Sequence, residues 1–299
     1  MAERLEPADP AGCLVTGGSP EEAGLQLTVR RGAGAPEMSA PAHRLTLTPA
    51  EWAVLTEGRL TDPPPGFPAP EVPSSERDDA VAALVRRAVL LPADEAGPAR
   101  PVPAVAGNLE VLRRPVLTLR LDVTGRAGAR SAWFAVGTGF VAGVLPLPGG
   151  GVELSLAPDV RLGAELARAV PDAAAITGFP EEPAGPEAVP SGRLPLGLLD
   201  DGATPPDGSP TTDEAGLAEE LRRRAAGSLS CLVLGRAGGS LAAGQVSWLA
   251  TDGGWVGLRP LPDGSPRRLV DVVAVQPDDL GTWVAPAVAA LLEASDEQP

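Results

Sequence analysis

Two stretches of the sequence follow one pattern, and a unit used twice limits what the chain can fold into. Residues 133–150 read WFAVGTGFVAGVLPLPGG, and residues 248–264 read WLATDGGWVGLRPLPDG. Each stretch begins with Trp, has a second aromatic residue seven positions later, Phe140 or Trp255, and then reaches Pro-Leu-Pro-x-Gly. A repeated unit restricts the fold to architectures in which two similar halves pack together.

The segments around these stretches also correspond in kind and order. Apolar residues at every second position predict two sets of short strands. These strands are residues 115–125, 131–137, 140–147 and 152–158 in the first set, and 228–235, 242–250, 253–261 and 267–275 in the second. A helix closes each set, at 159–170 and at 277–294. We therefore predict an α+β fold, an internally duplicated, pseudo-twofold unit with central antiparallel sheet meanders and flanking helices.

Shifts in composition divide the chain into five predicted parts. They are a loop-rich N-terminal extension with a strand pattern, 1–42, a first α/β repeat unit, 43–172, a Pro/Gly/acid-rich linker, 173–193, a second repeat unit, 194–294, and an acidic tail, 295–299. Two capping-box patterns mark helix starts, with Glu51 three residues after Thr48 and Glu214 three residues after Thr211.

The composition excludes several kinds of chemistry. The chain has no Lys, so it can form neither a P-loop nor a Schiff base. His43 is the single histidine, which excludes a multi-histidine metal site. The two cysteines, Cys13 and Cys231, form no C-x-x-C motif, which indicates reduced thiols rather than a zinc site or a disulfide scaffold.

The charge and hydropathy of the chain indicate a class of partner and a compartment. A net charge of −15 argues against nucleic acid, whose binders present a basic face, and favours a protein partner. No apolar run approaches the length of about 18 residues that a membrane span needs. No apolar signal-peptide core follows the early Arg4. We therefore expect a cytoplasmic protein without a membrane span.

No motif indicates catalysis or a cofactor. The glycine-rich GTGFVAG, residues 137–143, lies between two predicted strands, whereas a dinucleotide loop must open a helix. Its glycines are explained by hairpin turns. No G-x-S-x-G elbow is present, and adjacent carboxylate pairs such as Asp278 and Asp279 lie at helix starts or in loops. We expect no enzymatic activity and assign no catalytic, cofactor-binding or metal-binding residue.

The candidate functional residues are those suited to contact with another protein. Trp and Arg are frequent anchors of protein interfaces, and Trp255, with Leu258 and Arg259 beside the following turn, fits this role. Arg126 and Arg130, in the predicted turn TGRAGAR, are suited to an acidic or helical partner. The alternative is that the aromatic residues form the core and that the arginines lie in a solvated turn.

Three segments together resemble the EspG proteins of actinobacterial type VII (ESX) secretion. They are LTLTPAEWAVL at 45–55, ERDDAVAALVRRAVL at 76–90, and GGWVGLRPLPDG with LGTWVAPAVAALL between 253 and 292. The resemblance lies in the order of elements and the apolar pattern, over about residues 43–293. The chain departs from the family in a short turn at 125–130, in the additional residues 1–42, and in a proline-rich middle.

This resemblance implies a mixed α/β fold with quasi-twofold symmetry and a function without catalysis. EspG proteins are cytosolic chaperones that bind an apolar tip of helical secretion substrates and keep them soluble until export. A PE/PPE-like heterodimer or a WXG100-like protein would be the partner here, bound through sheet-side loops and the C-terminal helical part. The alternative is a self-associating scaffold of the same fold, a homodimer without a secretion substrate.

Overall fold

The computed structural model of the protein describes residues 43–95, 97–126, 128–178, 189–199, 210–237, 240–261 and 268–296. The predicted N-terminal extension, 1–42, lies outside these residues. The helices are α1 (Pro49–Thr56), α2 (Ser74–Arg86), α3 (Pro103–Arg113), α4 (Leu162–Ala169), α5 (Ala173–Thr177), α6 (Thr212–Arg224) and α7 (Leu280–Asp296). Short 3₁₀ turns are η1 (Pro148–Gly150), η2 (Asp159–Arg161), η3 (Leu196–Leu198) and η4 (Pro277–Asp279).

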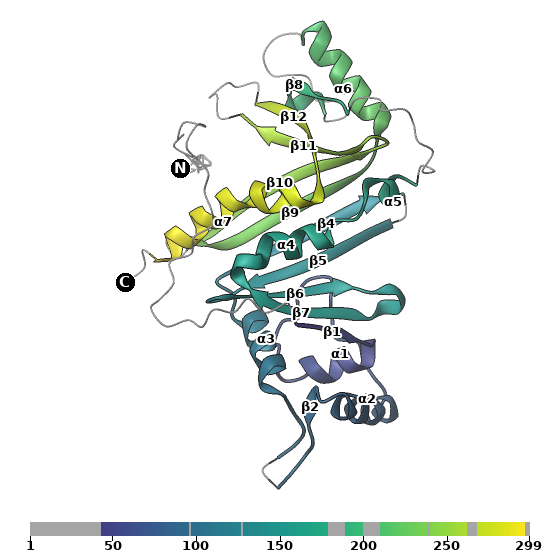
Figure 1. The fold of residues 1–299 in the computed structure, drawn as a ribbon, viewed down its shortest axis with the longest axis vertical. Helices are drawn as coiled ribbons and strands as arrows, with labels where there is room; N and C mark the ends of the chain where they lie inside the picture. Colours follow the sequence, from purple (N-terminus) through teal and green to yellow (C-terminus); the bar gives the residue numbers. More distant parts are fainter. Residues whose placement is uncertain are drawn as a thin grey trace, which may run out of the picture.

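Ten strands of the described chain form one sheet, in the order β1-β7-β6-β5-β4-β9-β10-β11-β12-β8 (Figure 1). They are β1 (His43–Leu47), β4 (Leu117–Gly125), β5 (Gly128–Val136), β6 (Phe140–Pro146), β7 (Val152–Pro158), β8 (Gly192–Pro195), β9 (Ala225–Ala237), β10 (Ser240–Thr251), β11 (Gly254–Pro260) and β12 (Leu269–Val275). All neighbours pair antiparallel. A small separate sheet pairs β2 (Leu90–Leu91) with β3 (Arg100–Pro101). The predicted α+β class with a central antiparallel sheet is confirmed.

The strand order is symmetric about the contact between β4 and β9. Two four-stranded meanders, β4–β7 and β9–β12, lie side by side, and each has one further strand at its outer edge. Leu121 lies opposite Cys231 at the centre of the β4–β9 pairing. Two residues to either side of this pair, Leu119 lies opposite Val233 and Val123 lies opposite Leu229. Leu119 thus corresponds to Leu229, and Val123 to Val233. Together with the matching order of strands on either side, this pairing indicates a local twofold axis between β4 and β9.

The residue-by-residue match between the two stretches that was predicted from the sequence is wrong by one position. Phe134 lies opposite Gly143 in the first meander, as Trp248 lies opposite Gly257 in the second. Phe134 and Trp248 are both fully buried in the same core cluster, whereas Trp133 belongs to a cluster on the other face of the sheet. Because side chains alternate between faces, a shift of one residue reverses every assignment.

The same shift applies to the second aromatic residue of each stretch. Val141, rather than Phe140, holds the position in β6 that corresponds to Trp255 in β11, two residues before the paired glycine. Equivalent positions thus carry different residues even where the backbones correspond. The symmetric arrangement agrees with an internal duplication, which itself stays a prediction.

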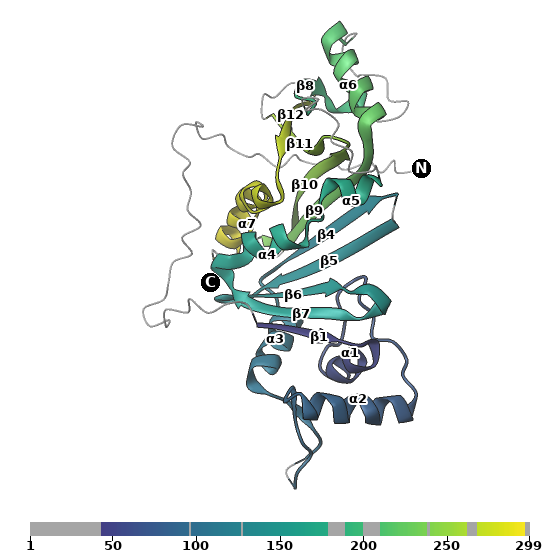
Figure 2. The same cartoon turned by 45° about the vertical axis from the view of Figure 1, so that its right-hand side comes forward.

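One face of the sheet is covered by α4, α5 and α7, which enclose the largest hydrophobic cluster (Figures 1 and 2). Helices α4 and α7 each follow a 3₁₀ turn, and they meet at Gly163 and Gly281. A Cβ atom on Gly281 would lie 2.7 Å from the Cα atom of Gly163. Glycine at position 281 therefore allows the two backbones to approach closely.

The opposite face is covered only at its two ends. Helices α1, α2 and α3 pack on the β1 end, and α6 packs on the β8 end (Figure 2). Both predicted capping boxes are confirmed, at Thr48 before α1 and at Thr211 before α6. The side chain of Glu51 is buried and also pairs with Arg87 at 2.8 Å.

Helices α3 and α5 and strand β8 are among the elements that were not predicted from the sequence. Helix α3 is held by Leu109 and Leu112 in the core and by Asn108, whose amide donates a hydrogen bond of 2.9 Å to the carbonyl of Ser155. Strand β8 extends the edge of the sheet beside β12. Helix α5 lies inside the segment predicted as a linker, where Ile176 packs against the backbone of β4 and β9. Among the helices that the structure describes, none is long and apolar enough to cross a membrane.

Candidate partner-binding surface

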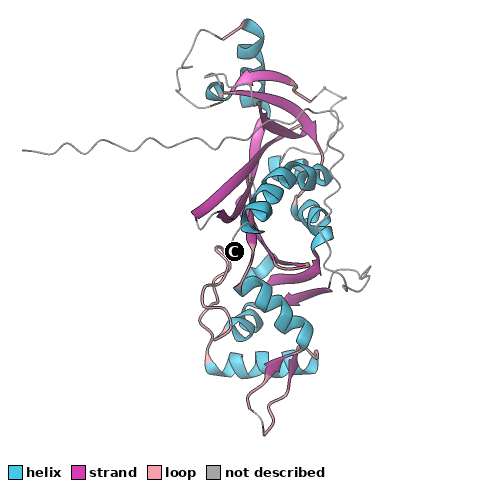
Figure 3. Cartoon of the chain, turned by 90° about the vertical axis from the view of Figure 1, so that its left-hand side faces the viewer, coloured by secondary structure: helices cyan, strands magenta, loops and turns pink. Residues whose placement is uncertain are grey.

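The middle of the sheet is uncovered by described helices on the face opposite α4, α5 and α7 (Figure 3). We call this area the open strip. It is formed by the side chains of β5, β4, β9 and β10 that point away from the main core: Thr118, Arg120, Asp122, Ser131, Trp133, Ser230, Leu232, Leu234, Leu241, Ala243, Gln245 and Ser247. Most of them are half-buried.

The register of the strands sets these side chains in rows across the sheet. One row runs from Trp133 through Arg120 and Leu232 to Gln245. Four adjacent strands span about 14 Å, since neighbouring strands lie about 4.8 Å apart. An α-helix with its side chains is about 10 Å wide. Trp133 on β5 packs against the cluster beneath α1–α3, so the remaining width is that of β4, β9 and β10, about 10 Å. This is enough for one helix, with α1–α3 on one side and α6 on the other.

One end of the open strip is apolar. Leu232 and Leu234 are partly exposed on the central strand β9, and Leu241 near the tip of the β9–β10 hairpin is 76% exposed. None of the three belongs to a hydrophobic cluster of the described residues. Neighbouring apolar side chains that remain in contact with water on an otherwise packed sheet mark a surface suited to binding another apolar group.

The other end of the open strip is polar and internally paired. Arg120 contacts Asp122 at 2.8 Å, and Asp122 also accepts a hydrogen bond from Ser131. The amide of Gln245 donates to Ser230 at 3.1 Å and to Ser247 at 3.2 Å. These groups satisfy one another, so the strip presents hydrogen-bonding groups without an unpaired charge.

The structure separates the residues that were predicted from the second stretch. Trp255 is 3% exposed, and its indole N–H donates a hydrogen bond of 2.9 Å to the carbonyl of Pro171. Leu258 lies on the opposite face, half-buried against the cluster beneath α6. Arg259 is exposed on the same face as Trp255, with its guanidinium 4.7 Å from the ring of Trp283. The buried indole of Trp255 thus belongs to the core contacts between the two halves.

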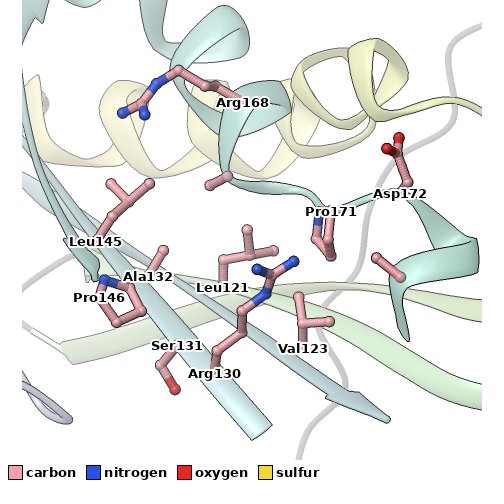
Figure 4. A pocket seen from close by; sticks show the side chains of 12 residues that line it. Leu121, Val123, Arg130, Ser131, Ala132, Leu145, Pro146, Arg168, Pro171 and Asp172 are labelled. Atoms are coloured by element: carbon pink, nitrogen blue, oxygen red, sulfur yellow. The ribbon is translucent and has the colours of Figure 1, made fainter. Parts of the chain in front are cut away.

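The two arginines of the β4–β5 turn do not reach the open strip. Arg126 is exposed at the turn itself. Arg130 extends from β5 on the face that carries α4 and α5, where its guanidinium points into a pocket (Figure 4). The five predicted residues are therefore spread over both faces of the sheet, and their role in partner binding stays a prediction.

Sequence reasoning missed Leu232 and Leu234, although a signal was present. The segment SLSCLVLG begins with strict alternation of Ser and apolar residues, then becomes apolar on both faces from Cys231 onward. A strand that is apolar on both faces is either buried on both or exposes one of them. The sequence does not show which, because that depends on whether a helix covers the second face.

Little in the described chain is arranged for reaction chemistry. No group of three or more His, Cys, Asp or Glu residues within it could hold a metal ion. Burial, with a smaller effect from the charge of Asp122, raises the pKa of the Cys231 thiol to about 12. A thiol that stays protonated in the core is a poor nucleophile.

Comparison with known proteins identifies the fold. No known family model and no curated protein matches the sequence. Among solved structures, the chain is similar to the Mycobacterium tuberculosis type VII secretion system chaperone EspG5, solved in complex with a PE25–PPE41 dimer. The TM-score is 0.50 at 10% sequence identity, over 85% of this chain and 96% of the other. The chain therefore has an EspG-like fold.

Proposed function

We propose that this protein is a non-enzymatic chaperone that binds helical type VII secretion substrates, of the PE/PPE or WXG100 kind, and keeps them soluble in the cytosol before export. The observation that carries the proposal is the open strip, an apolar and polar sheet surface that no described helix covers, one helix wide, between α1–α3 and α6. The EspG-like fold supports it, because the similar structure was solved with a PE25–PPE41 dimer bound.

The open strip explains how binding could protect an apolar helix end. Leu232, Leu234 and Leu241 supply apolar area, and a half-exposed leucine that becomes buried contributes about 1 kcal/mol. The hydroxyl and amide groups at the other end can bond to the polar flank of the same helix. A chaperone of this type acts by mass action, because the bound substrate no longer exposes the surface that aggregates.

The test is reconstitution with a helical heterodimer encoded by the same genome. We expect a defined complex by size-exclusion chromatography with light scattering. Leu234→Glu and Leu232→Glu each place a charge on the apolar end of the strip and should weaken binding at least about 10-fold, since burying an unpaired carboxylate is unfavourable. Val160→Glu, at an apolar position that is 62% exposed on η2, is the matched control and should bind as the unaltered protein does.

Two outcomes would contradict this function. If the Leu232 and Leu234 variants bind as tightly as the control while retaining their circular dichroism and Tm, the open strip is not the binding surface. If the purified protein instead forms a stable homodimer that these substitutions dissociate, and no helical substrate binds, the self-associating scaffold replaces the chaperone.

A further inference from the structure

A pocket opens where the helix of the first half is interrupted. Helix α4 ends at Ala169, the chain turns through Pro171, and α5 begins at Ala173. In the second half, α7 continues unbroken from Leu280 to Asp296. The interruption leaves a pocket of about 340 Å³ between the sheet and the α4–α5 connection (Figure 4).

The local symmetry shows what would otherwise fill this space. Arg130 lies opposite Val123 on β4, and Gly244 lies opposite the equivalent Val233 on β9. In the second half, α7 packs directly on that glycine, because a Cβ atom there would lie 2.5 Å from the Cβ of Ala287. The first half has the long side chain of an arginine at the same sheet position and no helix packed on it.

Arg130 is a charged group in a pocket lined by both polar and apolar side chains. Its guanidinium lies among Leu121, Val123 and Pro171 (Figure 4). Although the residue as a whole is exposed, partial burial lowers the pKa of its guanidinium. No ion pair joins the side chain to another residue of the described chain.

The other charged residues of the pocket do not neutralise Arg130. The guanidinium of Arg168 is turned away and lies 2.6 Å from Glu153 and 3.3 Å from Glu165 (Figure 4). The carboxylate of Asp172 points away from Arg130 at the opposite edge. The pocket thus presents the guanidinium of Arg130 beside the apolar side chains of Leu121, Val123 and Leu145.

We propose that this pocket binds a carboxylate carried on a short apolar group, with Arg130 as its counter-charge. A guanidinium offers two parallel donors to a carboxylate, and the pair is stronger where water is partly excluded. Leu121, Val123 and Leu145 would contact the apolar part of the ligand. The volume lies at the lower end of the range for small-ligand pockets, which limits the ligand to a few carbon atoms beyond the carboxylate.

The site is independent of the chaperone function, because it lies on the face of the sheet opposite the open strip. Its ligand chemistry has two sources, a free short-chain acid or the carboxyl terminus of a peptide. Hexanoate tests the first source, and a tripeptide ending in leucine tests the second. Hexan-1-ol and the C-terminally amidated peptide are the uncharged counterparts.

Isothermal titration of the full chain with these four probes tests the proposal. We expect at least one carboxylate to bind with a dissociation constant on the order of 1 mM, as for other small ligands. Its uncharged counterpart should bind at least about 10-fold more weakly. Arg130→Gln should weaken the carboxylate about 10- to 100-fold, since it removes a charged hydrogen-bond donor. Arg161→Gln, at an exposed arginine on η2, is the control and should change nothing.

A second variant tests the pocket without changing Arg130, in case Arg130→Gln affects folding. Ala175 is exposed at the pocket, so Ala175→Trp should block entry while leaving the Tm unchanged. Binding of the peptide alone would assign the source to a protein carboxyl terminus and support the site. Equal binding of the uncharged probes, unchanged binding by Arg130→Gln, or no binding by either carboxylate would each overturn it.

Discussion

The two halves of the sheet correspond closely near the local axis and diverge away from it. At the axis, Leu121 meets Cys231 and Gly163 meets Gly281, so each half supplies half of the contact. Farther out, the helical cover differs: α7 is unbroken, whereas α4 ends at Ala169 and α5, after the interruption, packs mainly against β9 and β10. Residues on the axis are constrained because a change there alters the contact between the halves. Positions away from the axis can vary more, and the pocket opens where the helical cover of the first half is interrupted. The open strip lies across the axis on the opposite face of the sheet.

Among equivalent positions of the two halves, Trp255 and Val141 should differ most in how much stability the protein loses when the residue is replaced by Ala. Trp255→Ala removes a buried ring and its hydrogen bond to Pro171, so we expect a loss of about 3–5 kcal/mol in the free energy of unfolding. Val141→Ala removes two methyl groups from the same position and should lower it by about 2 kcal/mol. Urea unfolding followed by far-UV circular dichroism measures both.

Trp255→Phe separates the ring from the hydrogen bond. It keeps most of the apolar volume but leaves the carbonyl of Pro171 without its donor, which should lower the free energy of unfolding by about 1–2 kcal/mol. If Trp255→Ala were no more destabilising than Val141→Ala, the indole would not connect the halves, and the residue would become available as a binding anchor.

The paired glycines of α4 and α7 should respond unequally to the same substitution. A Cβ on Gly281 would lie 2.7 Å from backbone of the other helix, whereas one on Gly163 would meet its nearest atom, the Cα of Gly281, at an ordinary 3.5 Å. Gly281→Ala should therefore destabilise the fold by about 1–3 kcal/mol through overpacking. Gly163→Ala should be neutral, or stabilising by about 0.5 kcal/mol through helix propensity. Equal effects in thermal unfolding would show that the helices do not cross at these residues.

The sequence was informative where a local pattern determines the structure. Alternation in residues 115–158 and 228–275 predicted both meanders, and the Ser/Thr-x-x-Glu patterns predicted the starts of α1 and α6. The register between the halves was wrong by one residue, since two tryptophans were aligned by type rather than by the face on which they lie.

The candidate surfaces depend on long-range packing, which no local pattern reports. Whether Leu232 is buried depends on helices that are far away in the sequence, and the pocket at Arg130 depends on an interruption around Pro171. The burial of Trp255 follows from a contact with that same interruption. Such features require the arrangement of both halves to be known.

Leu121 and Cys231 hold equivalent positions at the local axis, but only Cys231 carries a group that titrates. The stability contributed by Cys231 therefore depends on pH. Burial, then the charge of Asp122, raises the pKa of the thiol from 9.0 to about 12 in the folded protein. The neutral thiol therefore contributes its full stability below about pH 9, and this contribution is lost as pH rises toward 12, because only the unfolded chain ionises there. Between about pH 8 and pH 10 the free energy of unfolding should fall by about 1.4 kcal/mol from this group.

Cys231→Ala, compared with the unaltered protein over the same range, isolates that contribution. The variant should lose stability at every pH because of the cavity, but its decline above about pH 8 should be shallower. Leu121→Ala, at the equivalent position without a titratable group, should show the cavity effect with an unchanged slope. In a Cys13→Ser background, where Cys231 is the only thiol, rapid reaction of the native protein with a disulfide reagent would contradict the burial on which this prediction rests.

The smallest expected difference in stability loss is between the helix caps Thr48 and Thr211, which lie at opposite ends of the sheet face that carries the open strip. Thr48 and Thr211 both cap a helix with their hydroxyl groups, and each is matched by a glutamate that bonds back to the cap. Glu51 is buried and also held by Arg87, whereas the cap of α6 is exposed, so the box before α1 is more fully ordered. Thr48→Ala should therefore lower the free energy of unfolding by about 1–2 kcal/mol, and Thr211→Ala by about 0.5 kcal/mol. Thr→Ser at each site keeps the hydroxyl and serves as the control in urea unfolding. A larger loss at Thr211 would mean that α6 depends on its cap more than on packing, and that this wall of the open strip is the more easily displaced.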